Sequence, residues 1–448
     1  MKENNGHRRR RALWLRAMVV VGAFLLIIAC LGVARPPSSR VRRPQPLLEG
    51  RPRFRQPKND HKPSDSSSSD DDATIYAILR GEMSLVRLDA SHLEFDRNTL
   101  QYSNVRGLFC PISWKEHKDD PSTTPMFRDV LAKSPDCNPV WLDVAEIAAR
   151  ARAFDEHVSA GDRNIKPHTL TLGGVVFHES RCGSTLVANL LQAARPAQHR
   201  VYSESPPPVE ALRQGSRFPR QVVVPLVHDV IYLMSRSTDP AETHVFFKIQ
   251  SVGTRELPTF MAAFPDTPFL FVFRDPVEVL MSHFAAGPKR VAQANCARSY
   301  AHPPAVVTAR LEREMDNGNH NNSPHRRHSK PPVEDFCAAH LATLTETAVQ
   351  ALSHSNSLGR AVDYQQLPAV LWERILPAWG VELTDADVER LEHDTAAQYS
   401  KGRGPKAGAA FEGDSAHKQE AAWEAVQAAA GRYLQPSFAQ LQALSLEQ

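Results

Sequence analysis

The feature that most constrains the fold is an alternation of short apolar runs with helical stretches in the middle of the chain. Residues 175–177, 244–249 and 269–273 are rich in β-branched and aromatic residues, as buried strands are. Strands that alternate with helices form a parallel sheet with helices on both faces. The sequence therefore predicts an α/β fold, and the residues after Glu334 predict a mostly helical C-terminal part.

The first apolar run leads into a polar loop that carries the groups an anion requires. A helix is predicted over 185–194, and the backbone N–H groups at a helix N-terminus attract negative charge. Gly183 allows close approach of the backbone. Ser184 and Thr185 supply hydroxyl groups, and Arg181 supplies a positive charge. The alternative is an ordinary turn capped by Ser184 or Thr185.

The third apolar run ends in a second segment suited to an anion. Arg274 follows the apolar residues directly, and Pro276 suits the first turn of a helix. Ser282 lies eight residues after Arg274, about two turns into that helix. The two side chains can reach one anion only if the helix folds back beside the end of the strand. The alternative is a buried arginine paired with Asp275 and an unrelated helical serine.

Together, the two segments resemble the signatures with which the sulfotransferase superfamily binds 3′-phosphoadenosine 5′-phosphosulfate (PAPS). Residues 181–185, Arg-Cys-Gly-Ser-Thr, match the loop [K/R]-x-G-[S/T]-[S/T] for the 5′-phosphosulfate, in the arginine-bearing form of Golgi membrane-bound carbohydrate sulfotransferases. Arg274 and Ser282 match the 3′-phosphate signature, a strand followed by Arg-Asp-Pro with a serine eight residues after the arginine. The resemblance covers residues 170–290 and implies a P-loop-like parallel sheet, PAPS as co-substrate and no metal. The PAPS contacts that it implies are Arg181, Cys182, Gly183, Ser184, Thr185, Arg274 and Ser282.

The resemblance also implies a general base for the acceptor. Golgi members use a glutamate some twenty or more residues after the phosphate loop, often before a proline, and Glu204 stands in such a place. Lys248 is expected to stabilise the leaving oxygen. Cytosolic members place a histidine two residues after that lysine, but Gln250 stands there and cannot act as a base. His178 is the alternative base, and an exposed loop carboxylate is the alternative role for Glu204.

Two later segments extend the resemblance. Residues 363–367, Asp-Tyr-Gln-Gln-Leu, are similar to a Tyr-Glu-x-Leu element of the family. Residues 399–406 contain glycines and basic residues, as does the loop that makes a third PAPS contact in the family. The alternative for 399–406 is a solvated loop with no ligand.

The function that the resemblance implies is in-line transfer of a sulfuryl group to an acceptor hydroxyl or amine. The expected acceptor is a glycan, with a protein tyrosine or a small metabolite as alternatives. A P-loop kinase, a non-catalytic Golgi protein and an interaction protein remain as other readings, although the kinase would lack its lysine before Ser184. Nucleic acid is not an expected partner, because the net charge is only +3 and basic residues crowd into the first 60 positions.

The N-terminus predicts a membrane anchor. Residues 17–33 carry no charge and follow five arginines in 1–16, and a helix of this length spans about 26 Å. The basic residues predict a cytoplasmic tail, and the Pro-, Arg- and Ser-rich residues 34–73 predict a disordered stem. These features are typical of a single-pass type II protein of the Golgi membrane with a lumenal catalytic domain. The alternative is a cleaved signal peptide.

The remaining chain is expected to form two parts. Residues 74–165 predict an accessory N-terminal subdomain with a helix over 141–158, and 166–448 predict the sulfotransferase domain. Within the latter, 317–332 predict an exposed insertion with a glycosylation sequon at 321–323. Five cysteines lie outside the anchor, so at least one thiol is free, and Cys182 is the expected one. Connectivity stays open, with Cys110–Cys137 and Cys296–Cys337 as plausible pairs.

Overall fold

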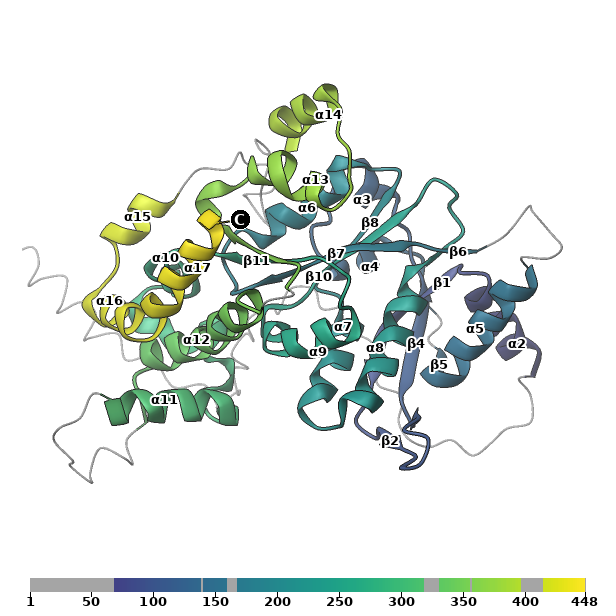
Figure 1. The fold of residues 1–448 in the computed structure, drawn as a ribbon, viewed down its shortest axis with the longest axis horizontal. Coiled ribbons are helices and arrows are strands. Elements are labelled where there is room, and N and C mark those ends of the chain that lie inside the picture. The colour runs from purple at the N-terminus through teal and green to yellow at the C-terminus, as the bar shows by residue number, and fades with distance from the viewer. Residues whose placement is uncertain are drawn as a thin grey trace, which may run out of the picture. The chain divides into compact units, whose positions relative to one another are not determined.

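A five-stranded parallel sheet lies at the centre of the fold (Figure 1). In the computed structural model, its strand order is β12-β11-β7-β10-β8, and every neighbouring pair is parallel. The predicted α/β fold class is therefore confirmed. The strands are β7 Thr171–His178, β8 His199–Ser203, β10 His244–Lys248, β11 Phe269–Phe273 and β12 Gly359–Asp363. The structure describes residues 68–137, 140–158, 167–317, 330–354, 357–395 and 414–447.

Helices cover both faces of this sheet because its strands are apolar on both sides. Val176 packs into one core cluster, whereas Val175 and Phe177 pack into another. The first cluster includes residues of α6 Ser184–Ala194, η7 Leu371–Ile375 and α13 Leu376–Ala378. The second includes residues of α7 Pro206–Leu212, α8 Arg220–Ser235, α9 Leu257–Ala263 and α12 Val333–Leu352.

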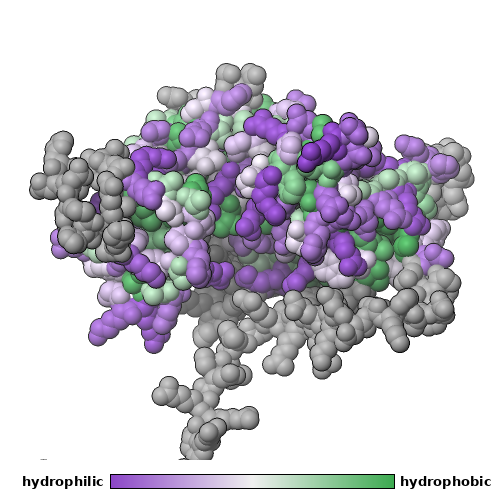
Figure 2. Space-filling view, turned by 90° about the horizontal axis from the view of Figure 1, so that it is seen from below, coloured by the Kyte–Doolittle hydropathy of each residue, from purple (hydrophilic) through white to green (hydrophobic). Residues whose placement is uncertain are grey.

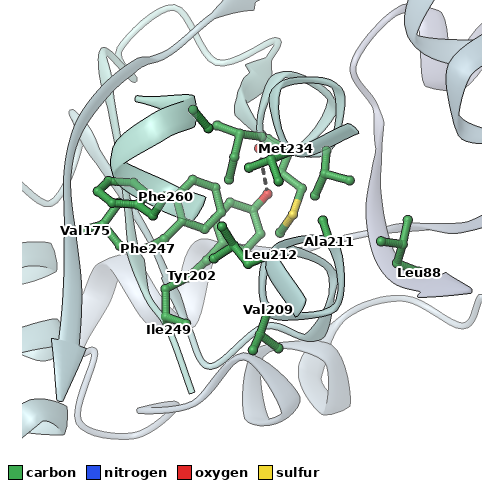
Figure 3. Packing of buried hydrophobic residues seen from close by; sticks show 14 of the residues in the cluster. Leu88, Val175, Tyr202, Val209, Ala211, Leu212, Met234, Phe247, Ile249 and Phe260 are labelled. Carbon is green, nitrogen blue, oxygen red and sulfur yellow. Dashed lines mark hydrogen bonds between the residues drawn. The ribbon is translucent and has the colours of Figure 1, made fainter. Parts of the chain in front are cut away.

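The second core cluster contains a buried tyrosine whose polar end is satisfied. Figure 3 shows Tyr202 stacked on Phe247, with 5.1 Å between ring centroids, and its hydroxyl donating to the carbonyl of Met234 at 2.9 Å. A buried Tyr hydroxyl needs such a partner. This packing holds the end of β8, next to Glu204, against α8.

The C-terminal part is mostly helical, as predicted, but it also adds β12 to the edge of the sheet. A third core cluster joins its helices. From this part they are α12, α16 Glu424–Ala429 and the turn η10 Ala430–Leu434. The cluster also includes residues of α10 Pro276–His283 and α11 Ala305–Asn317 from earlier in the chain. Strands β8 and β12 were not predicted from the sequence, because charged and other polar residues leave each with only two consecutive apolar residues.

The N-terminal described residues form a separate antiparallel sheet of order β1-β4-β5. Its strands are β1 Met83–Asp89, β4 Arg106–Pro111 and β5 Val140–Asp143. The helix predicted over 141–158 begins at Val144, as α5 Val144–Val158, because the residues before it pair with β4. Helix α2 Ser68–Leu79 begins within the predicted stem 34–73, so the end of that segment is helical.

The structure settles the cysteine connectivity that the sequence left open. Cys110 is bonded to Cys137 and Cys296 to Cys337, while Cys182 is free and buried. The sequon at 321–323, the loop 399–406 and most of the insertion 317–332 lie outside the described residues.

The predicted localisation requires a correction. Within the described part of the chain, no helix combines the length and the apolar character needed to cross a membrane. Even α12, with 20 residues, carries Glu334, Asp335 and Glu346. This finding contradicts the prediction of a single-pass type II protein of the Golgi membrane. The segment predicted as the anchor, 17–33, lies outside the described residues.

Figure 2 shows one face of the molecule, on which hydrophilic residues predominate and hydrophobic residues form small separate patches. Among the described residues, the large hydrophobic side chains classed as exposed are Tyr76, Val306 and Leu358.

Candidate active site at the carboxyl edge of the sheet

The predicted site residues lie at one edge of the parallel sheet, where its strands end. Loop 179–183 follows β7, Glu204 follows β8, Arg274 follows β11, and Lys248 is the last residue of β10. Strand β7 is also the point where the strand order reverses, with β10 on one side and β11 on the other. Ligands of open α/β sheets bind outside the carboxyl ends of the strands at such a point.

Loop 179–183 turns sharply before α6. Ser180, Arg181 and Gly183 have φ angles of 88°, 57° and 87°, in the left-handed region. For the two non-glycine residues this costs about 1–3 kcal/mol each, and such strain clusters at functional sites. Gly183 is the N-cap of α6, and its carbonyl accepts the N–H of Leu186 at 2.8 Å. The predicted strand, loop and helix are confirmed, with the helix beginning at Ser184.

Residues 363–367 close over this loop. A Cβ atom on Gly183 would lie 2.8 Å from Cδ2 of Tyr364 and 3.1 Å from Cδ1 of Leu367. On its other side, the Tyr364 ring lies 4.0 Å from the guanidinium carbon of Arg274. Tyr364 therefore stands between the two segments that the sequence assigned to phosphate binding.

A hydrogen bond joins these two segments directly. Nε of Arg181 donates to Oγ of Ser282 at 2.9 Å, across 101 residues of sequence. This contact is possible because α10 turns back beside the sheet edge, with the Asp275 carboxylate accepting the N–H groups of Val277 and Glu278 at 2.9 and 3.1 Å. The required folding back of the helix is thus observed.

Arg274 is buried and bound by acidic side chains. Its Nε donates to Glu278 at 2.5 Å, and its Nη2 donates to Asp414 at 2.7 Å and to Ser415 at 3.1 Å. Burial alone would lower the pKa of Arg274, but the bonds to Asp414 and Glu278 outweigh burial and raise it. In this conformation, Ser282 bonds to Arg181 while Arg274 bonds to these carboxylates, so the two predicted 3′-phosphate ligands are held by protein groups.

The two predicted catalytic residues form an ion pair. Nζ of Lys248 donates to Oε1 of Glu204 at 2.5 Å, and Nε2 of His178 lies 3.8 Å from the same oxygen. The amide of Gln250 donates to the backbone carbonyl of Glu204 at 3.3 Å. Glu204 also has a positive φ of 60°. The structure therefore brings together the predicted base, the alternative base and the predicted lysine.

Cys182 is the predicted contact residue whose side chain faces away from the loop. It is completely buried, and its thiol donates to the carbonyl of Val272 at 3.1 Å. Burial raises the pKa of Cys182 to about 12, so the thiol stays protonated. Only its backbone can contact a ligand, because the side chain packs into the core with Val176 and Leu186.

Sequence reasoning missed four groups at this edge. Glu278 is four residues after Arg274 on the same helix, a spacing that signals a pair. Glu179 stood inside the motif but was assigned no role. Tyr364 belongs to the segment noted for its resemblance. No local signal could have found Asp414, because it lies 140 residues from Arg274.

One pocket of the described residues lies away from this edge. It has a volume of about 440 Å³ and is lined by Arg195, His199 and His244, among others, at the amino ends of β8 and β10. At the carboxyl edge, Arg181 and Arg274 are held by protein groups, Ser282 and Asp414 respectively. The described residues contain no cluster of metal-ligating side chains.

The fold and this edge define an α/β protein with a phosphate-loop-like turn at the reversal point of a parallel sheet. No family model matches the chain, and no curated protein matches it. Among solved structures, the chain is similar to one described as a sulfotransferase domain from the curacin biosynthetic pathway, at 10% identity and a TM-score of 0.27, over 59% of this chain and 98% of that one. A similarity this low carries no functional conclusion.

Proposed function

We propose that this protein transfers a sulfuryl group from PAPS to an acceptor hydroxyl or amine, with a carbohydrate as the expected acceptor. The observation that carries the proposal is the bond between Arg181 and Ser282, at the edge that also holds Glu204 and Lys248. A nucleotide with 3′- and 5′-phosphate groups needs two anion sites that converge across one ribose. The two segments with those features meet here.

In the proposed complex, the loop and the N-terminus of α6 hold the 5′-phosphosulfate. Gly183 contributes its backbone N–H, Ser184 and Thr185 their hydroxyls, and Arg181 its guanidinium. Arg274 and Ser282 hold the 3′-phosphate. Binding then requires Arg181 to leave Ser282 and Arg274 to exchange its contact with Asp414 for the phosphate. Both exchanges replace one charge-assisted bond with another, so their net cost is small.

The transfer proceeds by in-line displacement. The acceptor oxygen or nitrogen attacks sulfur, the bond from sulfur to the 5′-phosphate oxygen breaks, and Glu204 accepts the acceptor proton. Lys248 and Arg181 stabilise the charge on the departing bisphosphate. Lys248 is suited to this role because a 2.5 Å bond to Glu204 already fixes its ammonium at the strand end.

We assign the acceptor side to the wall formed by the N-terminal residues. Met126 and Trp114 pack against β8, with the sulfur of Met126 3.7 Å from Oγ of Ser203 and the ring of Trp114 4.9 Å from that of Tyr202. Ser203 immediately precedes Glu204. An acceptor that reaches Glu204 from this side would therefore contact the subdomain predicted over 74–165.

The proposal is tested by incubating the chain with ³⁵S-labelled PAPS and a panel of neutral and acidic glycans, tyrosine peptides and small phenols. We expect label on a glycan with the wild type and a loss of at least about 100-fold in rate for Glu204→Gln, the usual contribution of a general base. Glu210→Gln, which changes a carboxylate on the adjacent helix α7, is the matched control and should transfer normally. Transfer to none of the acceptors by a chain that binds PAPS would instead favour the non-catalytic reading.

A further inference from the structure

Glu179 is a buried acid at the junction of the two phosphate-binding segments. It is 3% exposed and lies two residues before Arg181, at the start of the loop. Its backbone N–H donates to the carbonyl of Val272 at 3.3 Å, and its Oε1 accepts the backbone N–H of Arg274 at 2.7 Å. One residue of the first segment thus bonds to the end of β11 on both sides of Phe273.

The groups around Glu179 favour its neutral form. Burial raises the pKa of Glu179 well above its usual value, and the carboxyl groups of Asp363 and Asp275 act in the same direction. The N–H and the charge of Arg274 act against them, but more weakly than burial does. The Cys182 thiol is also near and protonated. A charged carboxylate here would need a full ionic partner, and Arg274 is already bound by Glu278 and Asp414.

We propose that Glu179 is a positioning residue that couples the phosphate loop to the Arg274 segment. The inference rests on the proposed function, since it concerns the two sites of one nucleotide. Its physical basis is that the Glu179 side chain bonds the start of the loop that turns at Arg181 to the backbone N–H of Arg274. A loose link would misplace one phosphate site relative to the other, and misplacement by about 1 Å can cost about 100-fold.

The test uses two matched substitutions and two nucleotides. Glu179→Gln keeps the accepting oxygen and the volume but cannot ionise, whereas Glu179→Ala removes the link. Affinities of the full chain for 5′-AMP and for 3′,5′-adenosine bisphosphate are measured by competition calorimetry. Their ratio gives the gain from the 3′-phosphate.

At pH 6 we expect Glu179→Gln to keep the wild-type ratio within about threefold, and Glu179→Ala to lower it by at least about tenfold. Glu242→Gln, which alters a buried acid bonded to Arg200 away from this edge, controls for lost stability and should leave the ratio unchanged. The inference would be overturned if folded Glu179→Ala kept the wild-type ratio. It would also be overturned if Glu179→Gln lowered the ratio as much as Glu179→Ala does.

Rescue by the conservative variant gives a readout that a purely structural role would not separate, because Glu179→Gln keeps the accepting oxygen that Glu179→Ala removes. If Glu179→Ala fails to fold, Glu179→Leu takes its place, because leucine fills a similar volume without an accepting oxygen. A wild-type affinity ratio in folded Glu179→Leu contradicts the proposal.

Amide hydrogen exchange separates this inference from the proposed function. The Arg274 N–H should exchange at least about tenfold faster in Glu179→Ala than in wild type. In Glu179→Gln its exchange rate should equal that of the wild type. If the wild type binds no bisphosphate, the proposed function fails, yet faster exchange at Arg274 still supports the link. Unchanged exchange in Glu179→Ala refutes the link whether or not the nucleotide binds.

Discussion

Two side chains at the carboxyl edge of the sheet, those of Lys248 and Glu204, carry opposite charges and form an ion pair. The Lys248 side chain is 1% exposed, while that of its partner Glu204 is 28% exposed. A buried ammonium without its partner is costly, whereas a carboxylate near the surface can gain water. Loss of the glutamate therefore costs more free energy than loss of the lysine, because it leaves the buried ammonium without a partner.

Glu204→Gln is accordingly expected to lower the free energy of unfolding by about 3 kcal/mol, and Lys248→Met by less. The double variant Glu204→Gln with Lys248→Met should recover part of the loss, because no unpaired charge remains buried. Urea denaturation of the four chains measures these differences. A larger loss for Lys248→Met than for Glu204→Gln would show that the carboxylate is the buried partner.

Gly183 is a second residue whose substitution has a defined cost. Gly183→Ala places a side chain at φ 87° and a Cβ atom 2.8 Å from the Tyr364 ring. We expect a loss of about 1–3 kcal/mol in unfolding free energy. Adding Tyr364→Ala should relieve the steric part and leave the conformational part. Chemical denaturation checks both, and wild-type stability in Gly183→Ala would contradict this account of the loop.

At the scale of elements, a disulfide ties the turn η4 Asn295–Ser299 to α12. It joins Cys296 to Cys337, 41 residues apart, within the third core cluster. Helix α10, which carries Ser282, packs in the same cluster. The crosslink thus supports the helical layer on which one predicted phosphate ligand stands.

Replacing Cys296 and Cys337 by alanine should lower the free energy of unfolding by about 4 kcal/mol, from the loop entropy regained by the unfolded chain. Guanidinium denaturation of the variant and the wild type without reductant measures the loss. The free thiol of Cys182 serves as an internal control, because its burial should protect it from iodoacetamide in both folded chains. Equal midpoints for the two chains would contradict the predicted contribution.

The strands that the sequence pattern predicted differ from those it missed in how many consecutive apolar residues they contain. The strands β7, β10 and β11 each contain at least three consecutive apolar residues, and α6 follows a recognisable turn, so all four were predicted. Strand β8 contains His199 and Arg200, and β12 contains Arg360 and Asp363, so their apolar pattern is broken. These edge strands exist because β10 and β11 each offer a free side for pairing.

In the candidate site, too, some residues could be predicted from local sequence and others could not. Arg181, Ser282, Glu204 and Lys248 could be named from local motifs, and the structure brings them to one edge. The partners that hold Arg274 could not all be named, since Asp414 comes from a distant segment. Local patterning gives the type of a group, but only the folded chain shows what that group already binds.

At the scale of the whole molecule, buried acids make stability depend on pH. Burial raises the pKa of Glu210 from 4.5 to about 7, even though it accepts the Leu88 N–H at 3.2 Å. Between these values the folded chain keeps a proton that the unfolded chain has released. Its contribution to stability is therefore largest at acidic pH and is lost as pH rises from about 4.5 to about 7.

We expect the urea midpoint of the wild type to fall between pH 5 and pH 8, and that of Glu210→Gln to fall by less. The amide cannot ionise and still offers an oxygen to Leu88. Denaturation curves at four pH values in this interval check the prediction. A steeper fall in Glu210→Gln than in the wild type would contradict the assignment.

The proposed function requires that the carboxyl edge of the sheet bind a nucleotide through two phosphate sites. Its most direct test is calorimetric binding of 3′,5′-adenosine bisphosphate to the full chain, to Arg181→Ala and to Arg274→Ala. Loss of one charged hydrogen-bond donor costs about 1.5–3 kcal/mol, so each variant should bind about tenfold or more weakly. Arg220→Ala, at an exposed arginine of α8, should bind as the wild type does. Micromolar binding that is weakened in both site variants is the predicted result, and absence of binding by the folded wild type would contradict the account.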